Sequence, residues 1–440
     1  NSDYISLTDL NLNRNSFTFS CWIKPNGIQE DYSGIFSVQD DATSFILNFK
    51  NGNNTIGFHP TWSWSSGLQA PANKWSHVAL VSNGSNVKIY VNGVESVNNT
   101  ALNSKIISKI DLGRYGRGYS SRYTKLEMDE VSLWNRPLSI DEIRQWRHLT
   151  KTTTTDPIFT GLVAYYQFNE TNGNISVNKT VNTNYAEYRG TSGANHNASN
   201  APVFEGKSEK VNVTSAGVKT FGLTGLSIDF ANGTYPNGDV WVSKGNINPD
   251  TLPDSLQDFN AYTIVNNYGV NQNFTPIEGI TFTDNIEYFT TTANSYKLYK
   301  RNSNDFGNNW GSVLDTGDAI SGSDGVTTQV SFSTDLTINS FSQFVLSNTE
   351  SNTLSINNVE DKNKPIIYPN PITKDANLNI NIPLDWGNST LVVYNIFGQK
   401  ISQSTLTRGE NILKLNTSSG IYNIVIFNSK HKFTKKLILE

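Results

Sequence analysis

Acidic residues in the stretch 125–134 are the first candidates for chemistry in this sequence. Glu127 and Asp129 stand two positions apart, and in a β-strand this spacing puts both carboxylates on one face. Retaining glycoside hydrolysis needs two carboxyl groups about 5–5.5 Å apart on such a face. The third acidic position of the pattern holds Val131, and Glu130 points to the opposite face unless a β-bulge turns it. We therefore expect no catalytic residues and no enzyme activity.

Two loops rich in aromatic and small residues form the candidate ligand-binding region. They cover residues 59–67 and 113–123. Exposed aromatic rings stack on sugar rings, and glycine-rich backbone lets a ligand come close. We expect these rings to bind a glycan or polymer surface; the alternative is that they only cover loops and sandwich edges. The ring-bearing candidates are Trp62, Trp64, Tyr115 and Tyr119.

Composition narrows the classes of protein to consider. The chain has 440 residues, 36% of them hydrophobic and 16% charged, and a net charge of −4. A weakly acidic chain does not suggest a nucleic-acid partner, and no apolar run approaches the roughly 20 residues that span a bilayer. The single cysteine, Cys21, excludes an intrachain disulfide, and its alternation with Phe19 and Ile23 predicts a buried strand position. The first residue, Asn1, predicts a trimmed fragment of a longer precursor.

Strand patterns separated by turn signals predict an all-β protein. We expect an N-terminal jelly-roll sandwich, a middle β-sandwich and a small C-terminal immunoglobulin-like sandwich. One short helix is expected at 139–147, because Ser139 and Glu142 have the spacing of a capping box. The predicted divisions are 1–170 for the jelly roll, 171–200 for an irregular connector, 201–348 for a spacer module, 349–365 for a polar linker and 366–440 for the last unit.

The last unit differs from the rest in charge. Seven Lys and one Arg against two Asp and two Glu give it +4, so the total of −4 leaves −8 on residues 1–365. Pro369 and Pro371 lack backbone donors, which places the entry strand at a sheet edge. Little chain follows the final strand, so its edge is expected to be open to a partner. The predicted strands are 376–382, 389–395, 400–406, 410–415, 421–427 and 432–438.

Four sequence blocks in the first 150 residues carry a family resemblance. In chain order they read FTFSCWIKP from Phe17, WSHVALV from Trp75, VKIYVNG from Val87 and MDEVSLWNRPLS from Met128. Their order and spacing resemble a laminin-G-like domain of the concanavalin A-like jelly-roll superfamily over about 1–170, with the usual first strand cut. Some members of this family hold calcium at the rim of the sandwich, through carboxylate and carbonyl oxygens. The candidate calcium ligands are Asp40, Asp41 and Asp111, and no other cofactor is expected.

The C-terminal unit resembles the type A sorting domain of the type IX secretion system. The resemblance rests on YPNP at its start, VYNIFGQK in its middle, and GIY and KKLI near its end. The candidate sorting-signal residues are Tyr368, Pro369, Asn370, Pro371, Gly398, Gly420, Tyr422, Lys435 and Lys436.

This second resemblance implies a route and partners. The chain would pass through the periplasm of a Bacteroidota-type cell and cross the outer membrane through a large β-barrel translocon. A smaller barrel protein would bind the sorting domain and shuttle it away, leaving the cargo at the outer-membrane surface or outside the cell. Residues 250–252 and 254–256 resemble the Asp-Ser/Thr-aliphatic pattern for O-glycosylation in such bacteria, which predicts glycans on Thr251 and Ser255.

Together these patterns predict a secreted or surface-displayed, non-catalytic binding protein of adhesin type. One alternative is an accessory region of a larger secreted enzyme, for example a polysaccharide-degrading one, whose catalytic domain lies outside this sequence. The other is a purely structural stalk.

Overall fold

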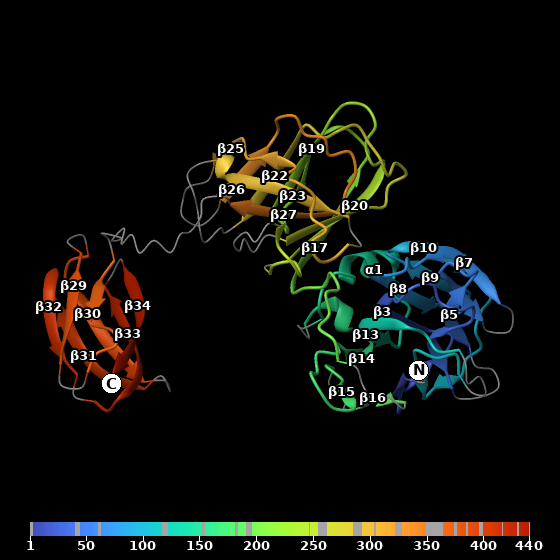
Figure 1. Cartoon of the computed structure of the whole chain (residues 1–440), viewed down its shortest axis with the longest axis horizontal. Coiled ribbons are helices and arrows are strands. Elements are labelled where there is room, and N and C mark those ends of the chain that lie inside the picture. The colour runs from blue at the N-terminus through green and yellow to red at the C-terminus, as the bar shows by residue number, and fades with distance from the viewer. Residues whose placement is uncertain are drawn as a thin grey trace. The chain divides into compact units, whose positions relative to one another are not determined.

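Figure 1 shows the chain as a computed structural model. The described residues are 3–39, 45–59, 63–116, 122–151, 155–180, 184–190, 196–245, 247–253, 262–284, 293–302, 305–321, 328–348, 364–373, 376–383, 386–395, 399–415, 417–428 and 431–439. The predicted all-β class is confirmed, because antiparallel sheets make up nearly all of the regular structure in these ranges. None of the described helices has the length and apolar content to cross a bilayer.

Two sheets form the N-terminal sandwich in the described residues. One sheet has the strand order β15 (Ile175–Val177), β16 (Tyr185–Arg189), β1 (Tyr4–Leu7), β12 (Ile110–Leu112), β4 (Gly34–Val38), β5 (Ile46–Lys50), β6 (Thr55–His59) and β7 (Trp64–Gln69). The other has the order β10 (Val94–Asn98), β9 (Val87–Val91), β8 (Ser76–Ser82), β3 (Phe17–Pro25), β13 (Leu126–Trp134) and β14 (Leu162–Tyr166). A small ribbon pairs β2 (Leu12–Asn13) with β11 (Ile106–Ile107).

Alternation along the strands builds the core of this sandwich. Phe17, Phe19, Cys21 and Ile23 of β3 all point into the main apolar cluster, as the two-residue period of a strand requires. The expected burial of Cys21 is confirmed, and burial raises the pKa of its thiol, so the thiol stays protonated. The helix α1 (Ile140–Trp146) also forms as predicted, with both hydrogen bonds of the capping box between its N-cap and Glu142.

The prediction of an irregular connector over 171–200 is wrong in part. β15 and β16 lie in this segment and extend the larger sheet, since β16 pairs with β1 along four residues. The sandwich therefore reaches to Arg189 rather than ending near 170. The segment is rich in Asn and Thr and buries few apolar side chains, chiefly Ala186, so backbone pairing more than apolar packing holds these strands.

The middle sandwich also has two described sheets. The six-stranded sheet runs β17 (Gly206–Val213), β20 (Gly238–Gly245), β21 (Tyr262–Asn267), β27 (Gln343–Asn348), β23 (Tyr296–Arg301) and β24 (Asp315–Thr316). The five-stranded sheet runs β18 (Gly217–Phe221), β19 (Leu226–Phe230), β22 (Gly279–Asp284), β26 (Thr328–Phe332) and β25 (Ala319–Ser321). Short 3-10 turns lie at η1 (Pro157–Phe159) in the N-terminal sandwich and η3 (Ala293–Ser295) here.

Buried contacts join these two sandwiches into one compact unit, residues 1–351. Arg147 follows α1 and is 4% exposed. Its guanidinium donates hydrogen bonds to the Tyr268 hydroxyl at 2.7 Å and the Asn266 side chain at 2.9 Å, both from the middle sandwich. An apolar cluster beside it joins Leu149 to residues of the middle sandwich, with Phe204 between them.

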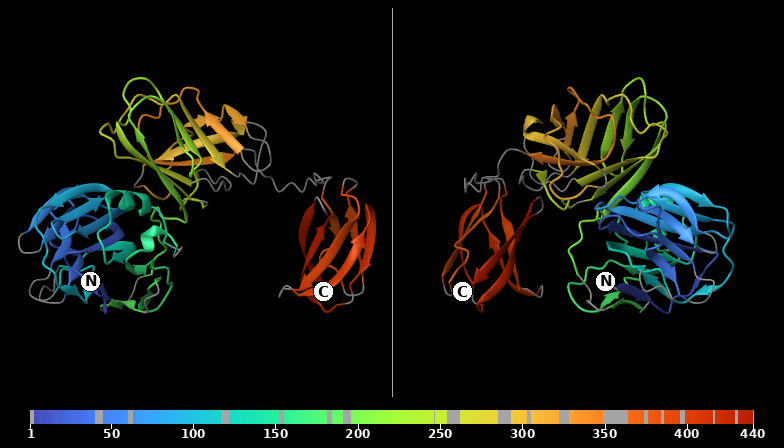
Figure 2. Two further views of the ribbon diagram at one scale, coloured as in Figure 1. Left: turned by 180° about the vertical axis from the view of Figure 1, so that it is seen from behind. Right: turned by 45° about the vertical axis from the view of Figure 1, so that its right-hand side comes forward.

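The C-terminal unit is a smaller two-layer sandwich, and Figure 2 shows its layers from two further sides. One described sheet has the order β28 (Ile366–Tyr368), β29 (Asn377–Ile382) and β32 (Gly409–Lys414). The other has the order β31 (Lys400–Leu406), β30 (Ser389–Asn395), β33 (Gly420–Phe427) and β34 (Lys432–Leu439). These six longer strands, β29 to β34, agree with the predicted ones to within one residue at each end. β28 lies at a sheet edge, and Pro369 and Pro371 follow it rather than lying within it.

The expectation that the last strand has an uncovered edge is wrong for its second half. Asn370 donates a hydrogen bond to the Lys436 carbonyl at 2.7 Å and accepts one from the Ile438 amide at 2.9 Å. Ile372 then donates its backbone amide to the Ile438 carbonyl at 2.8 Å. The backbone of β34 is therefore hydrogen-bonded along this half by the segment before β29, which lies about 70 positions earlier in the sequence.

Candidate functional site

A β-bulge interrupts β13 at the acidic run found in the sequence. Asp129 and Ser132 pair with successive outward positions of β3, so Glu130 and Val131 share the position between them. Glu130 has a φ of +53°, in the left-handed region that residues other than glycine rarely adopt. Val131 points into the core, whereas Glu130 reaches Tyr165 on the outer face, the side of Asp129. Because the bulge inserts one extra residue, the carboxylates of Glu127, Asp129 and Glu130 lie on the same face of the sheet.

Glu130 is nevertheless closed off from solvent. Its carboxylate accepts hydrogen bonds from the Tyr165 hydroxyl and the Gln167 amide. Burial raises the pKa of Glu130 to about 7, and the positive charge of Lys151 opposes that rise. Lys151 is itself buried, which lowers its pKa, and its ammonium lies 4.9 Å from the centre of the Tyr165 ring. Glu130, Lys151 and Tyr165 therefore form a packed polar cluster under the outer face, which supports the neighbouring residues rather than meeting a ligand.

Asp129 and Glu127 are the two carboxylates of β13 that border a pocket. Burial raises the pKa of Asp129 to about 6, although hydrogen bonds from Ser199 and from the Glu130 amide oppose the rise. Glu127 is more exposed, and one of its oxygens lies 2.7 Å from Lys24 Nζ. The charge of Glu127 is therefore balanced within the protein, while Asp129 is a largely buried acceptor whose charge depends on pH near 6.

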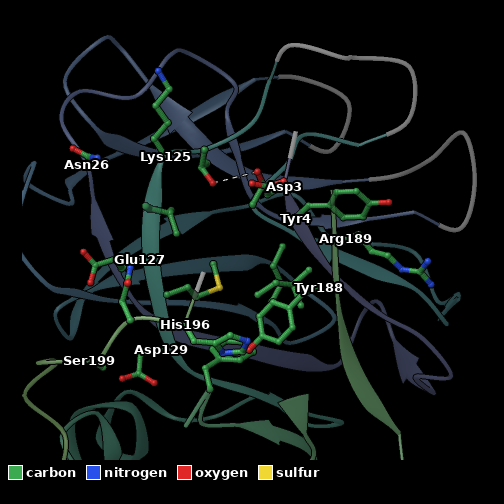
Figure 3. Close-up of a pocket in the computed structure, with 18 of the residues that line it drawn as sticks. Asp3, Tyr4, Asn26, Lys125, Glu127, Asp129, Tyr188, Arg189, His196 and Ser199 are labelled. Atoms are coloured by element: carbon green, nitrogen blue, oxygen red, sulfur yellow. Dashed lines mark hydrogen bonds between the residues drawn. The ribbon is translucent and has the colours of Figure 1, made fainter. Parts of the chain in front are cut away.

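The pocket has a volume of about 540 Å³ and opens beside the first half of β13. Its lining combines acidic, basic, amide and aromatic side chains, and Figure 3 shows Tyr188 and His196 together near Asp129. The lining residues are Asp3, Tyr4, Ile5, Asn26, Trp75, Leu112, Gly113, Thr124, Lys125, Leu126, Glu127, Met128, Asp129, Phe168, Tyr188, Arg189, His196, Asn197 and Ser199.

The early end of β14 explains why the pocket opens here. β14 ends at Tyr166, which pairs with Val131, so residues 126–129 have β3 on one side and no β14 residue on the other in the described register. The pocket fills that second side. Inward-facing residues of the strand, such as Met128, and outward-facing ones, such as Asp129, consequently line the same space.

The opposite wall comes from β1 and β16. Tyr188 pairs with Ile5 of β1, and its ring centre lies 6.1 Å from that of Phe168 and 5.1 Å from that of His196. His196 is fixed by a 2.9 Å hydrogen bond between its Nε2 and the Gly173 carbonyl. A hollow with adjacent rings on one wall and carboxylate and amide groups on another can hold a polar ring compound, through face contacts and charge-assisted hydrogen bonds.

Sequence patterns indicated the two carboxylates that β13 contributes to this pocket and missed its aromatic wall. Tyr188 and His196 fall in the segment predicted to be irregular, and Tyr4 lies in the first strand, far from β13 in the sequence. The available signal was the alternation of Ala186 and Tyr188 with polar neighbours over 185–189, a two-residue period that marks a half-buried strand.

The aromatic residues predicted to bind a ligand are placed elsewhere. Trp62 and Tyr119 lie outside the described residues. Trp64 opens β7 and is half-buried against the core. Tyr115 is 7% exposed, hydrogen-bonded to His59 at 3.0 Å; Arg122 lies 4.7 Å from the centre of its ring. The prediction of an exposed stacking face is therefore wrong for Tyr115, because its neighbours cover the ring.

The candidate calcium ligands do not form a site in the described residues. Asp40 and Asp41 lie outside them. Asp111 is fully buried, and one oxygen of its carboxylate is paired with the Arg114 guanidinium, so its charge is already balanced within the protein. No cluster of three or more His, Cys, Asp or Glu side chains that could hold a metal occurs in the part of the chain that the structure describes.

The O-glycosylation candidates give a similarly incomplete picture. Ser255 lies outside the described residues. Thr251 is half-buried, and its hydroxyl donates a hydrogen bond to the Gly307 carbonyl. A glycan on Thr251 would have to replace that bond, and modification of Thr251 stays a prediction.

Two of the sorting-signal blocks meet in the C-terminal unit although they stand far apart in the sequence. Asn370, between Pro369 and Pro371, binds the backbone of Lys436 and Ile438. Lys435 donates to the Ile367 carbonyl at 3.3 Å, directly before the exposed Tyr368. The first and last blocks of the signal thus form one surface.

The other signal residues have structural roles or lie outside the described ranges. Tyr422 is buried, and its hydroxyl donates to the Ser418 carbonyl at 2.7 Å. Gly420 is the first residue of β33 and pairs with Leu439. Gly398 is not among the described residues.

Comparison with known families gives two matches. A model of the concanavalin A-like lectin/glucanases superfamily, of laminin G type, matches residues 1–144. A model of the secretion system C-terminal sorting domain matches residues 366–440. No curated protein matches the chain.

Several solved structures are similar to parts of the chain. One is a candidate carbohydrate binding protein from Bacteroides ovatus ATCC 8483, with 18% identity and a TM-score of 0.36; the match covers 43% of this chain and 56% of that one. A heptameric SAP-like pentraxin from Limulus polyphemus has 15% identity, a TM-score of 0.28 and coverages of 32% and 74%. Domain 4 of an extracellular arabinanase from Geobacillus stearothermophilus, in complex with arabinotriose, has 20% identity, a TM-score of 0.27 and coverages of 31% and 68%.

Proposed function

Residues 1–144 belong to the concanavalin A-like lectin/glucanases superfamily, and residues 366–440 form a C-terminal sorting domain of the type IX secretion system. From these two assignments we propose that the chain is a secreted carbohydrate-binding protein. The sorting domain implies a secreted or surface location. The finer proposal is that the protein acts as an adhesin-like binder at the cell surface and that its glycan ligand occupies the pocket beside β13.

One observation carries the binding proposal: the pocket places adjacent aromatic rings close to a buried carboxylate. Tyr188 and His196 have ring centres 5.1 Å apart, and Asp129 lines the same pocket with two amide side chains, Asn26 and Asn197. Sugars offer apolar C–H faces to rings and hydroxyl groups to carboxylates and amides, and this pocket supplies all three partners. Glycans are therefore the ligand class that the lining fits best.

We expect His196→Ala to weaken glycan binding about fivefold, because one wall of the pocket loses a ring worth roughly 1 kcal/mol. A glycan array would first select a ligand for the full chain, and titration calorimetry would then compare the variants. Trp64→Ala is the matched control, since it removes a half-buried ring of the same sandwich that does not line the pocket. Equal loss of affinity in both variants, or full affinity in His196→Ala, would contradict binding of the ligand in this pocket.

The binding of a neutral glycan should also depend on pH through Asp129. Burial raises the pKa of Asp129 to about 6, so its carboxylate is mostly ionised at pH 7 and mostly protonated at pH 5. An ionised carboxylate accepts stronger hydrogen bonds from hydroxyl groups than a protonated one. Affinity should consequently fall about tenfold from pH 7 to pH 5, and Asp129→Asn should bind weakly with almost no pH dependence. A wild-type profile that is flat over this range would exclude Asp129 as a ligand contact.

We further propose that the pocket binds without hydrolysing its ligand. Glu127 is paired with Lys24 and Glu130 is buried under Tyr165, which leaves Asp129 as the carboxyl group that β13 offers to a ligand. Both glycosidase mechanisms use two carboxyl groups around the scissile bond. Incubation of the selected glycan with the protein should therefore release no new reducing ends.

A further inference from the structure

The outer face of the four-stranded sheet in the sorting domain combines apolar and basic residues in a regular arrangement. Leu391 and Val393 of β30 and Ile424 and Ile426 of β33 point into the core. The residues between them must face outward, because successive side chains of a strand alternate. We call the outward-facing set Ile421, Val425, Phe427, Lys432 and Lys436 the basic sheet face.

Register fixes the geometry of the basic sheet face. Phe427 of β33 pairs with Lys432 of β34, and Ile421 pairs with Ile438, two residues beyond Lys436. Ile421 and Phe427 are six residues apart, roughly 20 Å along the strand, and the two lysines are separated by roughly 13 Å on the neighbouring strand. The outward row of β33, apolar except for Asn423, therefore runs beside the outward row of β34 that carries both lysines.

The charge of this sheet has one sign. Its four strands contain Lys400, Lys432, Lys435 and Lys436 and not a single Asp or Glu. Lys435 is used within the fold, since it donates to the Ile367 carbonyl. No ion pair joins Lys432 or Lys436 to another described residue, so their charges are presented outward.

Apolar side chains are exposed at both ends of the basic sheet face. Ile421 is 45% exposed and Phe427 is 39% exposed. Val392, which pairs with Val425 between them, is only 3% exposed. The face therefore has two exposed apolar ends with a covered residue between them. Protein interfaces bury such an apolar centre within a polar rim.

We propose that the basic sheet face is the docking surface of the sorting domain, and that its occupant is an acidic protein surface of the export machinery. This inference rests on the proposed type IX export of the chain. Acidic groups of the partner would lie against Lys432 and Lys436, and an apolar patch of the partner would cover Phe427 and Ile421. Complementary charge fixes which partner is chosen and how fast it is met.

Charge reversal in the full chain tests the proposal. Lys432→Glu combined with Lys436→Glu would be expressed in a bacterium that has this secretion system, and extracellular and periplasmic protein would be measured. We expect the extracellular fraction to fall about tenfold or more, since like charges then face each other across the contact. Lys432→Gln with Lys436→Gln should give an intermediate loss. The matched control is Arg408→Glu with Lys414→Glu, which changes the net charge equally outside these four strands and should leave export unchanged.

The remaining outcomes separate the docking surface from the export function. If the chain without residues 366–440 stays in the periplasm while the Lys432 and Lys436 reversal is exported normally, the docking surface is wrong and export by the sorting domain stands. If the chain without residues 366–440 is exported as well, both proposals fail. Sedimentation of the wild-type chain with phosphatidylglycerol vesicles, lost on the same reversal, would show a lipid occupant and overturn the protein one. Thermal unfolding of each variant excludes a misfolded sorting domain as the cause.

Discussion

Removal of residues 366–440 should leave almost all of the protein in the periplasm, with little or none outside the cell. The sorting domain is a separate compact unit with its own apolar core, so its removal takes no side chain from the core of the N-terminal or middle sandwich. The truncated protein should therefore fold, bind glycan and accumulate behind the outer membrane. Cell fractionation followed by immunoblotting measures this distribution directly.

The control for this truncation is the converse fusion. Residues 352–440 joined to a periplasmic reporter should carry the reporter out of the cell, because the signal formed by Asn370, Lys435 and Lys436 is complete within that unit. Normal display of the truncated chain, or retention of the reporter in the periplasm, would contradict the assignment of this domain as the export signal.

Glu130→Ala should lower the free energy of unfolding of the N-terminal sandwich by about 1–3 kcal/mol, a substantial part of a typical domain's stability. The substitution removes a buried carboxylate whose negative charge favours the protonated form of the buried Lys151. It also removes the acceptor of the Tyr165 hydroxyl. Urea unfolding followed by tryptophan fluorescence measures the change.

Two further variants make this stability test specific. Glu127→Gln breaks the more exposed pair with Lys24 and should cost no more than about 1 kcal/mol. Glu130→Gln combined with Lys151→Met removes both buried charges and should be more stable than Glu130→Ala, since buried opposite charges are often replaced by uncharged groups with little loss. A Glu130→Ala variant as stable as Glu127→Gln would mean that the polar cluster does not support the bulge.

Periodicity predicted the sorting domain well, because its strands are short, regular and separated by clear turn residues. Each predicted strand from 376 to 438 agrees with an observed one to within a residue. The capping box at Ser139 and Glu142 was predicted equally well, since its two hydrogen bonds depend only on residues three positions apart. Local signals of this kind are contained in a short stretch of sequence.

The pocket could not be predicted in the same way, because it depends on contacts between distant segments. Ile5, Asp129 and Tyr188 meet only after β1 has paired with β16 and β14 has stopped short of Asp129. The outward turn of Glu130 depends on a bulge, and a bulge changes which face a residue occupies without any change in composition. Similarly, the cover that Asn370 gives to β34 joins residues 68 positions apart.

The buried charges of the N-terminal sandwich have a structural explanation. Glu130, Lys151 and Tyr165 hold the bulge from beneath, and the bulge fixes the direction of Asp129 at the edge of the pocket. Since β13 contributes only one carboxylate that a ligand can contact, the pocket is suited to binding a ligand rather than to cleaving it. The same acidic run would suggest catalysis if only its sequence spacing were considered.

A crystal structure of residues 1–351 with the best ligand from the glycan array is the most direct test of the proposed binding site. We predict that a sugar ring lies against Tyr188 and His196 and that one of its hydroxyl groups lies within hydrogen-bond distance of the Asp129 carboxylate. A ligand seated instead on the loops that carry Trp62 and Tyr119, with the pocket beside β13 empty, would contradict this prediction.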